Sequence, residues 1–352
     1  MLEEATVPVR AGEEIDLERL RRFLEAKLGL VGEPGVRQFP SGYSNLTYLV
    51  SVGDRELVLR RPPVGSKVKS AHDMGREFRV LSRLHPVYSR VPRPLASCDD
   101  LEVFGFPFYL MERVPGVILR ARLPPGVDLA PTVAAGLARE LIENLAVIHG
   151  LELEASGLGE LGRPQGYAAR QVKGWAERYA AARTEEVLDL EQAFARLCEN
   201  VPPDRGAALV HNDYKHDNLV LDPVDLTQIR AVLDWEMATV GDPLLDLGTT
   251  LGYWVEAGDA EELRRFRFGP TDLPDQPSRA DLSAMYAAKS GRDLSDLPFY
   301  YAFGLCKIAV IAQQIYQRYR QGLTKDPRFA HLPPVIAALG RQATKAQANG
   351  SL

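Results

Sequence analysis

Three short strand-like segments interrupt the otherwise helical second half of this chain, and this interruption constrains the fold more than any other feature. The segments cover 207–210, 218–221 and 229–233, with a turn at Asp222 and Pro223 between the last two. If these two pair antiparallel, residue numbers across the ladder sum to about 451, which places Asn218 beside Leu233 and close to Asp234. The pattern therefore predicts a hairpin that brings an amide and a carboxylate to one point.

Before this region, the apolar residues recur at helical spacing in some segments and at strand spacing in others. Apolar spacing predicts helices over 16–30 and 74–84 and strands over 46–52, 56–60 and 108–111. After a break at Pro115 and Gly116 the spacing is mostly helical, with one helix ending at Gly150 and another over 300–320. We therefore predict an α+β fold in which a small strand-rich lobe precedes a larger, mainly helical lobe. The expected division is an N-terminal helical extension over 1–30, an N-lobe over 31–114 and a C-lobe over 115–352.

The composition is that of an ordinary globular protein with enough chain for two lobes. The 352 residues are 45% hydrophobic and 25% charged, and the net charge is −5. Because acids and bases are interleaved, we predict neither nucleic acid nor a membrane as a partner. The longest apolar stretch, 300–316, contains Lys307 and is too short and polar to span a bilayer. The acidic N-terminus favours a cytoplasmic location, and no feature predicts an oligomeric state.

One segment combines residue types that suggest phosphoryl-transfer chemistry. Residues 211–218 fit the pattern H-x-D-x-x-x-x-N, with which kinases place a base and a metal-binding amide on one loop. Such a match arises by chance in on the order of one chain in a hundred of this length. Mg²⁺ prefers oxygen ligands and keeps several waters, so Asn218, Asp234 and ATP phosphates form a plausible ligand set.

These motifs make the sequence similar to the protein-kinase-like phosphotransferases of the aminoglycoside and choline kinase branch. Within that branch it most resembles the kinase-like domains found beside acyl-CoA dehydrogenases, over nearly the whole chain. The resemblance implies a protein-kinase-like two-lobe fold and the use of ATP and Mg²⁺. It implies that Asp213 accepts the proton of a substrate hydroxyl or orients its oxygen, and that Lys215 faces the γ-phosphate. It also implies that Asn218 and Asp234 hold Mg²⁺.

The resemblance extends to residues that support this loop. Residues 241–247 resemble the downstream G-D-P-x-x-D segment, whose second Asp, here Asp246, braces the catalytic loop by hydrogen bonds. His211 is expected to order the loop rather than to transfer a proton. For His216 and Asp217 we expect exposed positions, and for Tyr253 a place in the core.

The N-terminal lobe is expected to bind the nucleotide. Residues 41–47 occupy the place of the phosphate-covering loop, although a Gly-containing hairpin turn explains them equally well on their own. Arg60 stands where most kinases have a lysine, Glu77 is its expected ion-pair partner, and strand alternation points Arg61 to the opposite face. Residues 111–114 resemble the hinge that contacts adenine. The predicted nucleotide-binding residues are Gly42, Ser44, Asn45, Arg60, Glu77, Glu112 and Val114.

Three activities remain open for such a site, and the expected one is an ATP-dependent kinase whose partner is a hydroxylated small molecule. A protein kinase is disfavoured because seven residues separate Asp234 from Asp242, which leaves no room for a long activation segment. A nucleotide-binding pseudokinase stays an alternative, and Mg²⁺-dependent ATP turnover distinguishes it.

The charged residues of the second half bear on which class of molecule accepts the phosphate. An aminoglycoside is a polycation that needs clustered carboxylates, whereas acids at 259–262 are followed at once by arginines at 264–267. Lys307 adds a cation on a later helix, where it is expected to extend from the edge of the core toward solvent. With the resemblance above, this favours a hydroxyacyl-CoA or hydroxy acid over an aminoglycoside as the acceptor.

Overall fold

The computed structural model describes residues 4–40, 45–63, 74–124, 126–127, 129–154, 156–324 and 326–352. The chain forms two compact units. The N-terminal unit comprises Met1–Ile118, Glu154–Leu158 and Leu219–Ala238, and the helical unit comprises Leu119–Leu153, Gly159–Asn218 and Thr239–Leu352. The division of the chain at residues 30 and 114 into an extension and two functional lobes stays a prediction.

A five-stranded antiparallel sheet forms the centre of the N-terminal unit. Its strand order is β1 (Gly35–Gln38), β2 (Leu46–Val52), β3 (Arg55–Arg61), β5 (Phe108–Glu112) and β4 (Pro94–Cys98). Val52 pairs with Arg55 across a two-residue turn in which Gly53 has a φ of +55°, a value that favours glycine. The hairpin that the sequence predicted around Gly53 is therefore confirmed.

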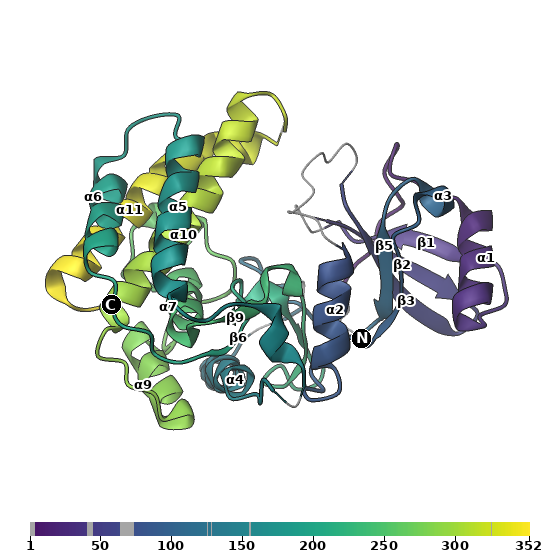
Figure 1. Cartoon of the computed structure of the whole chain (residues 1–352), viewed down its shortest axis with the longest axis horizontal. Coiled ribbons are helices and arrows are strands. Elements are labelled where there is room, and N and C mark those ends of the chain that lie inside the picture. Colours follow the sequence, from purple (N-terminus) through teal and green to yellow (C-terminus); the bar gives the residue numbers. More distant parts are fainter. Residues whose placement is uncertain are drawn as a thin grey trace. The chain divides into compact units, whose positions relative to one another are not determined.

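Helices α1 (Leu17–Leu28) and α2 (Met74–Leu84) lie on opposite sides of this sheet (Figure 1). Asp16 caps α1 by accepting a hydrogen bond from the Arg19 N–H, and Gly29 ends the helix in the left-handed conformation. Leu20 and Phe23 of α1 are buried in one cluster with apolar side chains of the sheet. This first helix is thus part of the core of the N-terminal unit. The short α3 (Leu101–Phe104) precedes β5.

A two-stranded hairpin of β7 (Leu219–Leu221) and β8 (Ile229–Val232) completes the N-terminal unit. Leu219 pairs with Val232, which is the predicted register, and the register shifts at Leu221. A Cβ on Gly116 would lie 2.4 Å from the carbonyl oxygen of Leu221, so only glycine fits there. The predicted chain break at Gly116 is therefore a point of close backbone contact with the hairpin.

The helical unit contains the remaining long helices and a second pair of short strands. The cluster of α5, α6, α10 and α11 is visible in Figure 1. Within the described part of the chain, no helix has both the length and the apolar character of a membrane span. The elements are α4 (Pro131–His149), α5 (Tyr167–Ala182), α6 (Leu188–Glu199), β6 (Ala208–Val210), β9 (Thr239–Gly241), α7 (Pro243–Tyr253), α8 (Glu261–Arg265), α9 (Arg279–Ser290), α10 (Leu297–Arg320) and α11 (Leu332–Asn349), with 3₁₀ turns η2 (His216–Asn218), η3 (Trp235–Met237, in the N-terminal unit) and η4 (Pro327–His331).

Helices α7 and α10 cross with their backbones in contact. A Cβ on Gly304 would lie 2.2 Å from the carbonyl oxygen of Gly248, and one on Gly248 would lie 2.1 Å from that of Tyr300. Real Cβ atoms do not approach a carbonyl oxygen so closely, so two glycines set the separation of the helices. The crossing joins α7, which carries Asp246, to α10, which carries Lys307.

Gly304→Ala is expected to lower the free energy of unfolding by about 2 kcal/mol or more, because the new methyl group forces the two helices apart. Gly174→Ala in α5 is the matched control. Its Cβ would meet only the end of the Arg178 side chain at 3.5 Å, so it should raise stability by about 0.5–1 kcal/mol. Urea denaturation measures both, and equal effects would contradict the close crossing.

Candidate functional site

The loop that connects β6 to β7 carries the H-x-D-x-x-x-x-N segment. Asn212 has a φ of 67°, a left-handed conformation that is uncommon for a residue with a side chain. Such backbone is retained only where the surroundings hold it, at a cost of about 1–3 kcal/mol. Three groups hold Asn212 here: Asp246, Lys307 and Tyr167.

Asp246 of α7 ties that helix to the loop. Its buried carboxylate accepts hydrogen bonds from the N–H groups of His211 at 2.6 Å and Asn212 at 2.7 Å. Its Oδ2 also lies 3.2 Å from Nε2 of His149, whose Nδ1 is 2.7 Å from the Tyr286 hydroxyl. Burial alone would raise the pKa of Asp246, but the hydrogen bond and charge of His149 hold it below its ordinary value. The anchor is thus an ionised carboxylate.

Lys307 of α10 contacts the loop from another side. Its ammonium group donates a hydrogen bond to the carbonyl oxygen of Asn212 and lies 5.7 Å from the centre of the Trp175 ring. The side chain is 1% exposed, so the expectation that it extends toward solvent is wrong. The reason is the glycine crossing, which brings α10 close enough for an inward-pointing lysine to reach the loop. Burial lowers the pKa of Lys307 to about 8.

Asp213 is surrounded by donors. The Lys215 ammonium donates to Oδ2, the Tyr253 hydroxyl donates to Oδ1 at 2.7 Å, and Asn218 Nδ2 donates to Oδ2 at 3.2 Å. Burial would raise the pKa of Asp213, but the charge and hydrogen bond of Lys215, with the Tyr253 hydroxyl, lower it. The carboxylate is therefore ionised at neutral pH and fixed in orientation.

Tyr253 is buried as expected, but its hydroxyl makes it part of the Asp213 environment. Its ring and that of Phe268 lie 5.0 Å and 5.5 Å from the Lys215 ammonium. His216 is buried rather than exposed, with its ring 5.5 Å from that of Trp254, and burial lowers its pKa to about 4. The expectation of an exposed His216 is wrong because the 3₁₀ turn η2 directs it inward.

In the N-terminal unit, Arg60 forms the predicted ion pair with Glu77. Both side chains are buried, and Glu77 Oε1 also accepts the N–H of Trp235 at 3.2 Å. A second contact joins Arg60 Nη2 to Asp234 Oδ1 at 3.1 Å. Burial alone would lower the pKa of Arg60, but the charge of Glu77 holds it well above its ordinary value. The arginine is therefore a fixed cation between two carboxylates.

Arg61 points to the other face of β3, as strand alternation predicted. It donates hydrogen bonds to the Tyr48 hydroxyl and to the Glu13 carbonyl, both at 3.0 Å, and lies 4.1 Å from the Phe106 ring. It is therefore a structural residue of the N-terminal segment and does not share the environment of Arg60.

The remaining predicted nucleotide-binding residues are placed as follows. Asn45 donates to Glu236 Oε2 at 2.7 Å, and Gly42 and Ser44 lie outside the described residues. Glu112, at the end of β5, donates its N–H to the Arg93 carbonyl at 2.8 Å, and Val114 follows two residues later. Because the Glu112 N–H already donates to Arg93, the predicted contact of Glu112 with adenine would be made by its carbonyl oxygen.

The two predicted metal ligands are an amide oxygen, from Asn218, and a carboxylate oxygen, from Asp234. Asn218 directs its Nδ2 at Asp213, so its amide oxygen is the atom available to a cation. Among the residues that the structure describes, no group of three or more His, Cys, Asp and Glu is arranged to hold a metal. Mg²⁺ prefers oxygen ligands and usually takes several of them from phosphates and water, so a protein site for it needs few side chains.

A family model described as a phosphotransferase enzyme family matches residues 35–282, more than half of the chain. The chain belongs to this phosphotransferase family. Its members act on hydroxyl groups of small molecules, and the N-terminal sheet with a mainly helical remainder is the kinase-like fold.

Individual relatives agree with this assignment. The chain is 34% identical to acyl-CoA dehydrogenase family member 11 of Gallus gallus over 98% of its own length and 45% of that protein. It spans less than half the length of the first curated relatives it matches. A solved structure from Ralstonia eutropha, provisionally described as an aminoglycoside phosphotransferase, is 29% identical with a TM-score of 0.79, covering 94% and 99% of the two chains. A ternary complex of an aminoglycoside phosphotransferase with AMP-PNP and hygromycin B shares the fold, at 16% identity and a TM-score of 0.59, covering 94% and 98% of the two chains.

Lys307→Met is expected to change how stability depends on pH. Between the folded pKa of about 8 and the ordinary value of 10.5, the unfolded chain binds more protons at Lys307 than the folded chain. The free energy of unfolding of the wild type should therefore rise relative to the variant as pH increases through this window. The slope is at most about 1.4 kcal/mol per pH unit, the linkage of one proton.

Urea denaturation from pH 7 to pH 10 measures this difference. Lys289→Met, at an exposed position of α9, is the matched control because that side chain is in water in both states. A difference between wild type and Lys307→Met that stays constant over this range would contradict a buried, charged lysine.

Proposed function

We propose that this member of the phosphotransferase family transfers the γ-phosphoryl group of Mg·ATP to the hydroxyl of a small hydroxyacyl thioester or hydroxy acid. The observation that carries the proposal is the ionised Asp213 carboxylate, held by Tyr253 and Lys215 on a loop whose backbone is anchored by Asp246. Phosphoryl transfer to an alcohol needs a base for the hydroxyl proton and a cation near the phosphoryl oxygens, and an oriented carboxylate next to a lysine can supply both.

Asp213 orients the acceptor hydroxyl and takes its proton as the new phosphate ester bond forms. Its lowered pKa makes it a weak base, which suits a loose transition state in which the proton leaves late. In this proposal the Lys215 ammonium group turns from Asp213 toward the transferring phosphoryl group and stabilises its negative charge. His211, through its N–H bond to Asp246, keeps the loop in the orientation that this transfer needs.

Asn218 and Asp234 would hold Mg²⁺ through their side-chain oxygens. When bound, the ion neutralises charge on the phosphates of ATP. To hold the ion, Asp234 would give up its contact with Arg60, and Arg60 would contact phosphate while keeping its ion pair with Glu77. Gly42, Ser44 and Asn45 are assigned to the phosphate-covering loop, and the Glu112 carbonyl and Val114 N–H to adenine. Use of ATP is supported by the AMP-PNP complex of the structural neighbour.

Two other functions remain distinct alternatives. An aminoglycoside kinase is suggested by the neighbours of known structure, and a pseudokinase would keep the nucleotide site without transfer. The relatives described as acyl-CoA dehydrogenase family members favour an acyl-type acceptor instead. A screen of hydroxyacyl-CoA esters, hydroxy acids and aminoglycosides with Mg·ATP, read by mass for an added phosphate, separates all three. Phosphorylation of aminoglycosides alone would refute the proposed acceptor, and ATP binding without any product would favour the pseudokinase.

Asp213→Asn is expected to lower kcat by roughly 10²–10⁴ while Mg·ATP binding stays within a few-fold, because the change removes only the proton acceptor. Asp293→Asn, on an exposed surface of the helical unit, is the matched control and should keep full activity. Steady-state kinetics and nucleotide titration measure the two effects. Near-normal turnover of Asp213→Asn would remove this residue from the mechanism.

Asp234→Asn is expected to weaken the metal-dependent part of nucleotide binding, because it removes a formal charge from the Mg²⁺ ligands. The measurement is the Kd of ATP at increasing Mg²⁺, in wild type and variant. A Mg²⁺ dependence equal to that of the wild type would show that Asp234 is not a ligand.

A further inference from the structure

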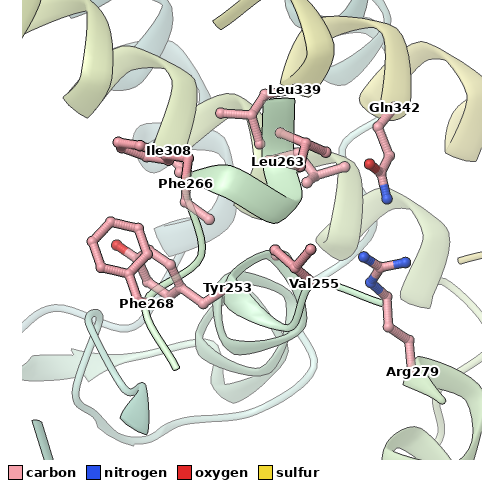
Figure 2. Close-up of a pocket in the computed structure, with 11 residues that line it drawn as sticks. Tyr253, Val255, Leu263, Phe266, Phe268, Arg279, Ile308, Leu339 and Gln342 are labelled. Carbon is pink, nitrogen blue, oxygen red and sulfur yellow. The ribbon is translucent and has the colours of Figure 1, made fainter. Parts of the chain in front are cut away.

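A small hollow in the helical unit begins at the tyrosine that contacts Asp213 (Figure 2). We propose that this hollow binds a short, uncharged aliphatic segment of the phosphate acceptor, so that the acceptor is an alcohol with an alkyl chain next to its hydroxyl-bearing carbon. The inference rests on the proposed function and assigns a specificity-determining site to it.

An aromatic wall connects the hollow to the candidate catalytic carboxylate. The Tyr253 hydroxyl donates to Asp213 Oδ1 at 2.7 Å, and the ring of the same residue lines the hollow. The Phe268 ring packs edge-on against it at 5.1 Å, and both rings lie beside the Lys215 ammonium. A molecule whose hydroxyl lies at Asp213 therefore has its adjacent carbons next to these rings.

The lining of the hollow is apolar over most of its surface. Its enclosed volume is small, about 20 Å³, and the value of about 320 Å³ for the whole hollow includes the part that opens to solvent. Leu305, Ile308 and Leu339 are almost completely buried and close the inner side, whereas Phe266 and Phe268 are half-buried. None of the described residues that line it carries a carboxylate. The full lining is Gly252, Tyr253, Val255, Leu263, Phe266, Phe268, Arg279, Leu305, Ile308, Leu339 and Gln342.

The two polar side chains at the far end are already paired. Figure 2 shows Arg279 and Gln342 directed toward each other, at the end opposite Tyr253 and Phe268. Arg279 forms ion pairs with Asp259 and, at 3.3 Å, with Glu256, and Gln342 donates to Asp259 at 3.2 Å. The guanidinium charge is therefore balanced by carboxylates that do not line the hollow.

This arrangement selects against a charged ligand. An ammonium group in the hollow would lose its water and, among the described side chains of the lining, would meet no carboxylate, which is unfavourable. An alkyl chain has no such hydration to lose, and each methylene that it buries strengthens binding, lowering Kd about fourfold. A short chain is indicated because Leu305 and Leu339 close the inner side.

Binding of unreactive ligands tests the hollow without requiring catalysis. The probes are straight-chain acyl-CoA esters and the matching free carboxylates from two to eight carbons, titrated calorimetrically in the presence of Mg·ADP. We expect Kd to fall about fourfold per methylene up to a limiting length and then to level off. Whichever of the two series binds identifies the source of the acyl group, and a Kd independent of chain length in both would overturn the proposal.

Variants at the inner wall locate the effect. Leu339→Ala should move the limiting length to longer chains, and Leu339→Phe should move it to shorter chains. Leu188→Ala, which removes an exposed leucine of the same unit, is the matched control and should leave the series unchanged. If Leu339→Phe does not fold, as judged by circular dichroism, Leu263→Ala replaces it and should lengthen the limit. An unchanged limiting length in the folded variants would overturn the assignment.

Turnover with the hydroxylated members of the series separates this inference from the proposed function. Chain-length-dependent binding without any phosphate transfer would refute the kinase and keep the hollow as a binding site. Efficient transfer that is insensitive to chain length and to Leu339 would support the kinase and refute the role of the hollow.

Discussion

The buried carboxylate of Asp246 accepts two consecutive N–H groups from the loop that carries Asp213, and the geometry of the candidate site depends on this contact. It stabilises the left-handed backbone of Asn212, whose carbonyl is held in turn by Lys307. An anion from one helix and a cation from another therefore hold the N–H and the carbonyl group of Asn212. The glycine contact between α7 and α10 lets the two helices come this close.

The two units use charge in different ways. In the helical unit, Lys215 and the Tyr253 hydroxyl lower the pKa of Asp213, so the carboxylate is ionised at neutral pH. In the N-terminal unit, Glu77 and Asp234 hold Arg60 as a fixed cation. Arginine stays charged even when buried, and it offers several donors, so it can retain one carboxylate while it binds a phosphate. These properties are the physical basis on which the proposed function assigns phosphate binding to Arg60.

The sequence was sufficient to predict the local features and insufficient for the contacts made in tertiary structure. The β7–β8 register and the turn at Gly53 follow from strand alternation and turn residues, and the pairing of Arg60 with Glu77 follows from the resemblance to kinases. His149 contacts a helix far away in the chain, and Tyr253 and Lys307 contact the loop from helices far away in the chain; none of these three residues belongs to a motif. Strand β9, with three residues, is too short for its period to be recognised.

The central claim is direct transfer of the γ-phosphoryl group from ATP to an acceptor hydroxyl, and a single-turnover experiment tests it most directly. An acceptor labelled with ¹⁸O in its hydroxyl is mixed with excess enzyme and Mg·ATP, quenched rapidly and analysed by mass. The account predicts ADP and a phosphate ester in equal amounts, with the ¹⁸O retained in the ester. Formation of ADP with inorganic phosphate alone, or of an ester that has lost the label, would contradict it.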